Sequence, residues 1–295
     1  MLDDNFDNID NTGSEPFVGG FIRQKPDPKD FKIATIYKLF GIKEPAKLPT
    51  KVDLRAKCSP IVDQGQLGSC TANAGSGLVD FCENKQGYGF LVGSRLLLYY
   101  NTRVKIEKNP AKQDTGCTIR GTLKSLGTYG ICKEPTWPYI ISKFGTAPNK
   151  TAVGEAANYR ALTYALVDQP GMSGTAVLTA IKQQLVNGIP MEFGFDVFDS
   201  YSQASRTGAF PYPSKNENRV GGHAILCVGF DDSKVITNTI DKTSTKGAFL
   251  IRNSWGTGWG EKGYGWLPYD YVTKNFQGTR LATDFWVLLS EAWKK

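Results

Sequence analysis

Histidine is almost absent from this 295-residue chain: His223 is the only one, so any reaction that requires an imidazole must use it. A zinc site built on two or three histidines is therefore excluded. The sequence also has no Cys-x-x-C pair, which argues against a zinc ribbon and against a thioredoxin-like redox centre. Nothing in the sequence therefore implies that the protein uses a metal ion or an organic cofactor.

Long apolar runs and dense basic runs are missing as well. The longest apolar runs, such as 224–228 and 286–289, are far shorter than the roughly 20 residues that a membrane-spanning helix needs. The net charge is +7, but Lys and Arg are dispersed, so we expect no nucleic-acid partner. The acidic first residues lack the apolar stretch of a secretory signal. We expect a monomer that binds no membrane.

The six cysteines are too few and too irregularly spaced for a disulfide scaffold. If one of them stays free as a nucleophile, the other five cannot all pair. This odd count favours a reducing compartment or a mostly thiol protein. Cys58 and Cys132 each lie beside a turn, and a bond between these two is left open.

Residues 1–47 differ in composition from the rest of the chain. The first sixteen residues carry five acidic side chains and no basic one, and little apolar periodicity follows before Phe31. We interpret residues 1–47 as an extension, without a convincing inhibitory helix, that lies on a domain formed by residues 48–295. A disordered tail and a regulatory prosegment are both compatible with this composition.

The domain begins with helical patterns and ends with strand patterns. Helices are expected over 70–86, 94–105, 118–129 and 175–186. Strands are expected over 191–197, 223–230, 248–252, 264–267 and 283–289, with the polar stretch 231–246 as an exposed loop. Helices first and strands second predict an α+β chain with two lobes.

One motif places a thiol where it is activated. Cys70 stands in the first turn of a predicted helix, directly after a glycine-containing bend. The helix dipole and the unpaired N–H groups there favour the thiolate, which is the nucleophilic form. Gln64 and the backbone N–H of Cys70 offer two donors for an oxyanion hole. A lone cysteine at a helix start is usually structural, so this assignment depends on the partners described next.

Two further motifs supply those partners. His223 follows two glycines at the start of an apolar strand, and Asn253 stands at a strand end before Trp255 and a glycine-rich turn. An amide oxygen can accept a hydrogen bond from one imidazole nitrogen and hold the ring for a thiolate. Trp255 would cover that bond against water.

In the order Gln, Cys, His, Asn, these motifs resemble those of the papain-like cysteine peptidases. The resemblance extends over about four fifths of the chain: residues 48–55 look like the family's mature N-terminus, and 253–263 match its Asn-Ser-Trp-Gly signature. It implies a papain-like two-lobed α+β fold. A helical lobe carries Cys70, a strand-rich, barrel-like lobe carries His223, and the active-site cleft lies between them.

Carried onto this sequence, the resemblance makes Cys70 the nucleophile, His223 the acid and base, and Asn253 the residue that orients the imidazole. Gln64 becomes the oxyanion donor. The expected activity is hydrolysis of polypeptides through a thioester on Cys70. Carboxydipeptidases of the family use paired histidines, which this sequence lacks, so we expect an endopeptidase.

The resemblance also suggests where a substrate binds. By loose alignment, the main side-chain pocket has its floor near 282–284, where the carboxylate of Asp284 would either face the pocket and add tolerance for arginine or point to solvent. The sequence departs from the family pattern at Leu67, which replaces a disulfide half, and at Thr71, which replaces an aromatic. Neither departure removes a reacting atom. The expected substrate contacts are Gly116, Cys117, Gly222, Trp255 and Asp284.

Two alternatives stay open: a catalytically inactive papain-like binding protein, and another acyl-transfer enzyme such as a transglutaminase or amidase. Fold analogy alone does not separate them. The intact Cys70, His223 and Asn253 favour the peptidase. The short extension and the absent signal resemble microbial or large-virus members, which predicts a cytoplasmic protein or, from a viral source, a virion-associated one.

The extension is the expected regulatory partner of the cleft. Residues 1–50 carry a net charge of −1 and residues 51–295 a net charge of +8, which would favour electrostatic docking. Family prosegments lie across the cleft, often in a direction that is not cleaved, so this resemblance implies an intramolecular inhibitor. The inhibition would be partial and would weaken at high salt. Proteolytic maturation would cleave the chain within residues 44–50.

Overall fold

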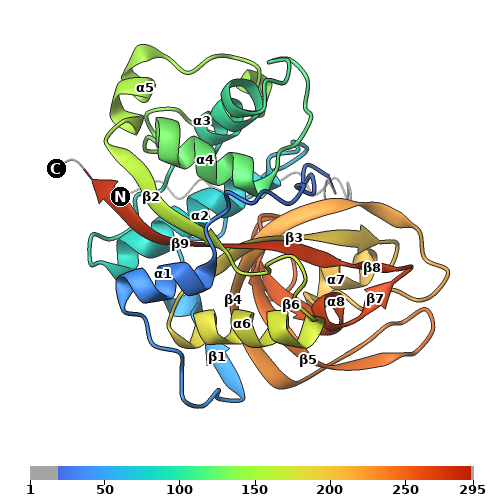
Figure 1. Ribbon diagram of the computed structural model, residues 1–295. Coiled ribbons are helices and arrows are strands. Elements are labelled where there is room, and N and C mark those ends of the chain that lie inside the picture. Colours follow the sequence, from blue (N-terminus) through green and yellow to red (C-terminus); the bar gives the residue numbers. More distant parts are fainter. Residues whose placement is uncertain (1–18, 294–295) are drawn as a thin grey trace, which may run out of the picture.

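The computed structural model describes residues 19–293, so the acidic start of the extension lies outside the described residues (Figure 1). The helices are α1 (Ile33–Phe40), α2 (Cys70–Lys85), α3 (Arg95–Tyr100), α4 (Ile119–Tyr129), α5 (Lys150–Ala156), α6 (Gly174–Val186), α7 (Tyr201–Thr207) and α8 (Asp270–Thr273). The strands are β1 (Lys51–Asp53), β2 (Tyr159–Leu166), β3 (Met191–Phe198), β4 (Arg219–Thr237), β5 (Ser244–Arg252), β6 (Tyr264–Pro268), β7 (Asn275–Phe276), β8 (Thr279–Arg280) and β9 (Ala282–Trp293).

An antiparallel sheet with the strand order β2-β9-β3-β4-β5-β6 forms the centre of the fold, and β1 pairs with β4 outside this path. Helices α2 to α5 gather on one side of the sheet, and α6 lies on the other (Figure 1). This arrangement is the predicted α+β fold with a helical lobe and a strand-rich lobe. Within residues 19–293, no helix is long and apolar enough to cross a membrane.

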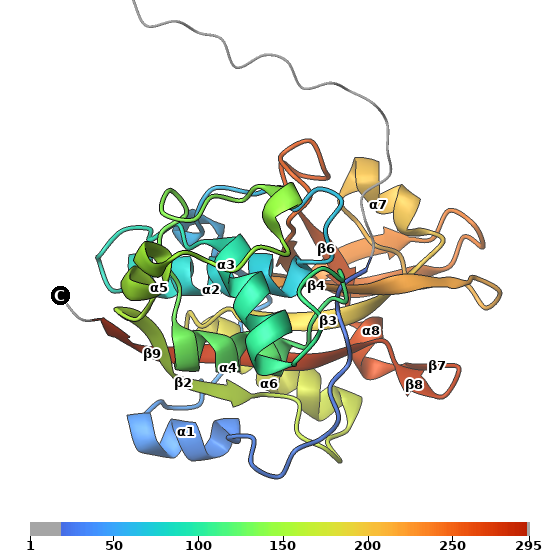
Figure 2. The same cartoon turned by 90° about the horizontal axis from the view of Figure 1, so that it is seen from above.

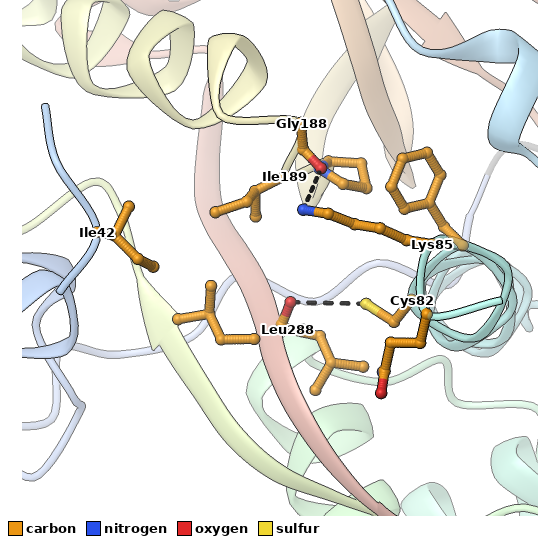
Figure 3. Close-up of a pocket in the computed structure, with 10 residues that line it drawn as sticks. Ile42, Cys82, Lys85, Gly188, Ile189 and Leu288 are labelled. Carbon is orange, nitrogen blue, oxygen red and sulfur yellow. Dashed lines mark hydrogen bonds between the residues drawn. The ribbon is translucent and has the colours of Figure 1, made fainter. Parts of the chain in front are cut away.

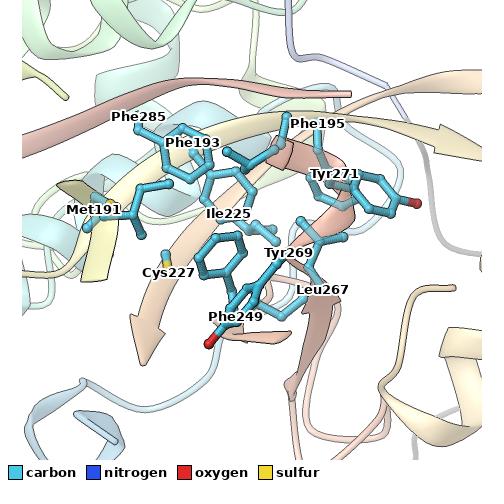
Figure 4. Packing of buried hydrophobic residues seen from close by; sticks show 14 of the residues in the cluster. Met191, Phe193, Phe195, Ile225, Cys227, Phe249, Leu267, Tyr269, Tyr271 and Phe285 are labelled. Atoms are coloured by element: carbon cyan, nitrogen blue, oxygen red, sulfur yellow. The ribbon is translucent and has the colours of Figure 1, made fainter. Parts of the chain in front are cut away.

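The alternation of side chains along β4 explains why both faces of the sheet are buried. Ala224, Leu226 and Val228 pack with residues of α2 and α4, whereas Ile225 and Cys227 pack with residues of α6 on the opposite face. Figure 4 shows the hydrophobic cluster on the face of Ile225 and Cys227, in which aromatic rings from several strands meet. Phe193 and Phe285 stack there with centroids 4.6 Å apart. The two cores hold the sheet between α2 and α4 on one face and α6 on the other.

The four predicted helices are confirmed, and three of them, α3, α4 and α6, begin at a side-chain cap, whereas α2 begins without one. The hydroxyls of Ser94, Thr118 and Ser173 each accept a hydrogen bond from a backbone N–H in the first turn of α3, α4 and α6. The second of these helices is shorter than expected, because α3 passes into a π-helical segment, Asn101–Ile106. At the other end of α4, Gly130 has φ +72°, which a glycine adopts without strain.

The prediction of a loop over 231–246 is correct for 238–243 and wrong for the residues on either side. Strand β4 continues to Thr237, β5 begins at Ser244, and the two pair as a hairpin that projects from the lobe. Its arms are polar because they are largely exposed to solvent, and the register shifts between 231 and 235 interrupt the alternation that would have revealed a strand. Because the hairpin is exposed and contains a bulge, its sequence is polar and lacks alternation, and it therefore resembles the sequence of a loop.

The extension and the cysteines add two further findings. Helix α1 forms within the extension, where apolar periodicity begins at Phe31, and the chain before it pairs with β2, where Leu166 N–H donates to Phe31 O at 3.0 Å. All six cysteines are free thiols, so the bond left open between Cys58 and Cys132 does not form.

Candidate active site

Cys70 occupies the first turn of α2, as predicted, and its side chain is fully buried. The thiol donates a hydrogen bond to Gly19 O, with Sγ and O 3.7 Å apart. Burial raises the pKa of Cys70 to about 12, although backbone N–H groups, among them that of Ala224, act in the opposite direction. Because Ala224 follows His223 on β4, the thiol lies where the helical lobe meets the strand that carries the imidazole.

His223, Asn253 and Trp255 form one buried unit. His223 Nε2 and Asn253 Oδ1 are hydrogen-bonded at 2.8 Å, and the backbone N–H of Ser254 donates to the same oxygen at 2.8 Å. The indole of Trp255 lies nearly parallel to the imidazole, with centroids 4.5 Å apart and an interplanar angle of 19°. Burial lowers the pKa of His223 to about 4. The ring is therefore held in place and kept neutral while it is enclosed.

Gln64 connects the loop before α2 with the loop that follows Asn253. Its Oε1 accepts from Ser254 Oγ at 2.6 Å, and its backbone N–H donates to Ser254 O at 2.9 Å. One N–H of the side-chain amide donates to Leu67 O at 3.1 Å, which leaves the second for another acceptor. The loops that carry Gln64 and Asn253 are thus joined directly.

Residues 19–24 of the extension pass through the cleft and contact both lobes. Cys117 N–H donates to Gly20 O at 2.8 Å and Ile22 N–H donates to Cys117 O at 3.0 Å, which pairs Phe21 with Cys117 in parallel. On the other lobe, Phe21 N–H donates to Gly222 O at 3.4 Å. Figure 2 shows this dark blue segment passing from the region of β3 and β4 to α1. We call residues 19–24 the cleft segment.

Glycines make room for the cleft segment. A Cβ on Gly116 would lie 2.4 Å from Gly20 O, and one on Gly194 would lie 2.0 Å from the ring of Phe21. Phe21 itself is only 6% exposed, because its ring fills the space above Gly194. Sequence reasoning missed Gly194, since a glycine inside a strand has many structural explanations.

Polar contacts anchor the segment at its C-terminal end. Arg23 Nη2 donates to Asp196 Oδ2 at 2.5 Å, and Gln24 N–H donates to Asp284 Oδ2 at 3.2 Å. Further along, Arg120 and Asp30 form an ion pair. The extension therefore contributes a cation, Arg23, to one pair and an anion, Asp30, to the other, so its docking is not explained only by an acidic extension on a basic domain.

The predicted substrate contacts fall into two groups. Gly116, Cys117, Gly222 and Asp284 all lie against the cleft segment, whereas Trp255 covers the imidazole. Asp284 is nearly buried, and burial raises its pKa to about 6. Asp196 and Gly194 complete the set and were not anticipated from the sequence.

A separate cavity of about 350 Å³ lies at the C-terminal end of α2 (Figure 3). Ile42, Ile189 and Leu288 line its apolar wall, and Lys85 Nζ donates to Gly188 O at 3.0 Å. Burial lowers the pKa of Lys85. None of the predicted site residues lines this cavity, so we do not assign it to the active site. Among residues 19–293, no group of His, Cys, Asp and Glu side chains is placed to hold a metal ion.

Comparison with known proteins gives a consistent result. Residues 48–277 match the family model described as papain family cysteine protease. An uncharacterized peptidase C1-like protein of Acanthamoeba polyphaga mimivirus is 35% identical over 286 residues, covering 91% of this chain and 86% of that protein. Digestive cysteine proteinase 1 of Homarus americanus is 25% identical and covers 77% of this chain and 64% of its own length.

Solved structures agree with the sequence relatives. Xylellain, a cysteine protease from Xylella fastidiosa, superimposes with a TM-score of 0.74 at 32% identity, covering 94% of this chain and 98% of that one. Digestive procathepsin L 3 of Tenebrio molitor has a TM-score of 0.59 at 22% identity, with 84% of this chain and 72% of that one covered. The second likeness concerns the fold alone.

Proposed function

The chain belongs to the papain family of cysteine proteases and is a peptidase, and from this premise we propose that Cys70, His223, Asn253 and Gln64 are its catalytic residues. The observation that carries the proposal is the pairing of His223 with Asn253 beneath Trp255, on the strand whose next residue, Ala224, directs its backbone N–H to the thiol of Cys70 at the start of α2. No other histidine exists in the chain to take this role.

In the proposed reaction, Cys70 and His223 form a thiolate–imidazolium pair once water enters the cleft. The thiolate attacks the carbonyl carbon of the scissile peptide, and the oxyanion accepts from the free N–H of Gln64 and from the Cys70 backbone. His223 protonates the departing amine and leaves a thioester. A water molecule, deprotonated by the same imidazole, then releases the carboxylic acid and restores the thiol pair. Asn253 keeps the ring oriented throughout.

We propose that residues 1–47 are a prosegment and that the cleft segment is its inhibitory part. Gly19 occupies the place in front of Cys70, and Phe21 fills the space above Gly194. In this closed arrangement, burial raises the pKa of Cys70 and lowers that of His223, so thiol and imidazole stay neutral. The segment therefore excludes substrate and also suppresses the reactive ion pair.

Removal of the Phe21 ring tests this inhibition. In the full chain, Phe21→Ala is expected to raise kcat/KM for a fluorogenic peptide by about tenfold or more, because a buried phenylalanine contributes about 1.5–3 kcal/mol to the closed arrangement. Ile22→Ala is the matched control, since Ile22 is 41% exposed in the same segment. High salt should activate the unmodified chain by a smaller factor, because it weakens the part-exposed pairs of Arg23 and Arg120. Equal rates for all three proteins would make the segment a passive tail.

Maturation is proposed to occur within residues 44–50. This stretch connects α1 to β1 and is mostly exposed, as a cleavage site requires. A cut there leaves β1 paired with β4, so the sheet of the peptidase domain, residues 48–295, is preserved.

We expect endopeptidase cleavage, since the chain lacks the second histidine of the paired-histidine device that carboxydipeptidases use. Mass spectrometry of a digested unstructured protein should show internal fragments, and this signal should vanish after thiol alkylation. Dipeptides released mainly from C-termini would contradict this prediction. Alkylation-sensitive amide transfer without hydrolysis would favour the transferase alternative, and no turnover at all would favour the inactive binding protein.

A further inference from the structure

The side chain of Asp196 forms a charged wall in the cleft that the proposed reaction does not use. It lies on β3 two residues after Gly194, so both residues face the same side of the strand. Asp196 is 6% exposed, and its two carboxylate oxygens accept from Arg23 Nη2 at 2.5 Å and from Arg219 Nε at 2.8 Å. An almost buried carboxylate of this kind requires a cationic partner.

Two backbone carbonyls complete the surroundings of the Arg23 guanidinium. Nη2 of Arg23 donates to the carbonyls of Arg280 and Leu281, both at 3.0 Å. Leu281 O also accepts from the backbone N–H of Asp196 at 3.0 Å, so the carboxylate and the carbonyls are held together by main-chain pairing. A cavity of about 220 Å³, lined in part by Asp196 and Leu281, lies beside them. The group consists of one side-chain carboxylate on β3 and two backbone carbonyls just before β9.

We propose that Asp196, with the carbonyls of Arg280 and Leu281, forms a guanidinium-binding subsite that selects an arginine side chain in peptide substrates. This inference rests on the proposed function and extends it to specificity. One nitrogen, Nη2 of Arg23, contacts all three acceptors, so the subsite binds the charged end of the arginine side chain. In the closed arrangement, Arg23 fills the subsite, so the extension and an arginine substrate compete for the same groups.

Asp284 has a different role in this arrangement, although the sequence suggested it as the arginine partner. Its carboxylate accepts the backbone N–H of Gln24 at 3.2 Å, and its own N–H donates to Asp168 Oδ2 at 2.9 Å. In the closed arrangement, the side-chain cation of the segment is bound by Asp196 and Asp284 binds its backbone. We therefore expect the loss of the Asp196 carboxylate to remove the preference for arginine, and the loss of the Asp284 carboxylate to leave it.

The test uses full-length Phe21→Ala/Arg23→Gln, in which the cleft segment lacks its ring and its cation. Fluorogenic peptides carry arginine at one position at a time, and matched peptides carry citrulline, which has the same shape without the charge. At one position or more, kcat/KM is expected to be about tenfold or more higher for arginine than for citrulline. Adding Asp196→Asn should reduce this ratio to about one. Adding Asp284→Asn or Arg219→Gln should leave it above about five.

Each outcome decides the matter. A ratio near one at every position, or a ratio that survives Asp196→Asn, overturns the subsite while the cleaved citrulline peptides still support the proposed function. If no peptide is cleaved, the proposed function fails, and the subsite is judged by binding. A labelled peptide of residues 19–30 should then bind the same full-length protein about tenfold more tightly with arginine than with citrulline at position 23. Equal affinities overturn the proposal.

Discussion

Cys70→Ala is expected to abolish peptide hydrolysis, lowering kcat by about four to six orders of magnitude, while the protein remains folded. The substitution removes the atom that forms the thioester, and a methyl group fits the buried position at the start of α2. Hydrolysis of a fluorogenic peptide measures the loss, and thermal unfolding checks the fold. Turnover close to that of the unmodified chain would end the assignment of Cys70 as nucleophile.

His223→Ala should be as damaging as Cys70→Ala, and the double variant should be little worse than either, because nucleophile and base act as a unit. Asn253→Ala should cost less, since Asn253 orients the imidazole through its 2.8 Å bond and does not itself react. Additive losses in the double variant would argue that thiol and imidazole act in separate steps.

Gln64→Ala is expected to lower kcat by about 100- to 1,000-fold, or roughly 2.7–4 kcal/mol in the barrier, if the amide stabilises the oxyanion. The change also removes the bond from Ser254 Oγ to Gln64 Oε1. Ser254→Ala is therefore the matched control, because it breaks the same bond and keeps the amide N–H. Equal losses in the two variants would show that the link between the loops matters and that the donor does not.

The sequence alone determined those parts of the protein that depend on local order. A thiol at the start of a helical pattern, an imidazole after two glycines, and an amide before a Trp-Gly turn are contiguous signals, and from them Cys70, His223 and Asn253 were predicted as catalytic residues. The four helices followed from apolar periodicity and from capping residues such as Ser94 and Thr118. The interactions that start and stabilise these helices involve residues within one or two turns of each other, so the local sequence pattern is enough to predict them.

Strand β2 and the hairpin of β4 and β5 required the tertiary structure. Strand β2 becomes a strand because β9 pairs with it from more than 100 residues away, and the hairpin is polar because it extends into solvent. Neither cause leaves a periodic signal in the segment itself. Long-range pairing overrides weak local preference in such places.

The cleft segment and its contacts were likewise decided only in three dimensions. A sequence contains Phe21, Arg23, Gly194 and Asp196 as unremarkable residues, and nothing in their spacing brings them together. The fold does so, because β3 presents Gly194 and Asp196 on one face and the extension crosses that face with Phe21 and Arg23. Catalytic residue types are set by the chemistry they must perform and can be recognised along the chain. The proposed occlusion of the cleft and the proposed recognition of arginine depend on which surfaces meet, and that is determined by tertiary packing.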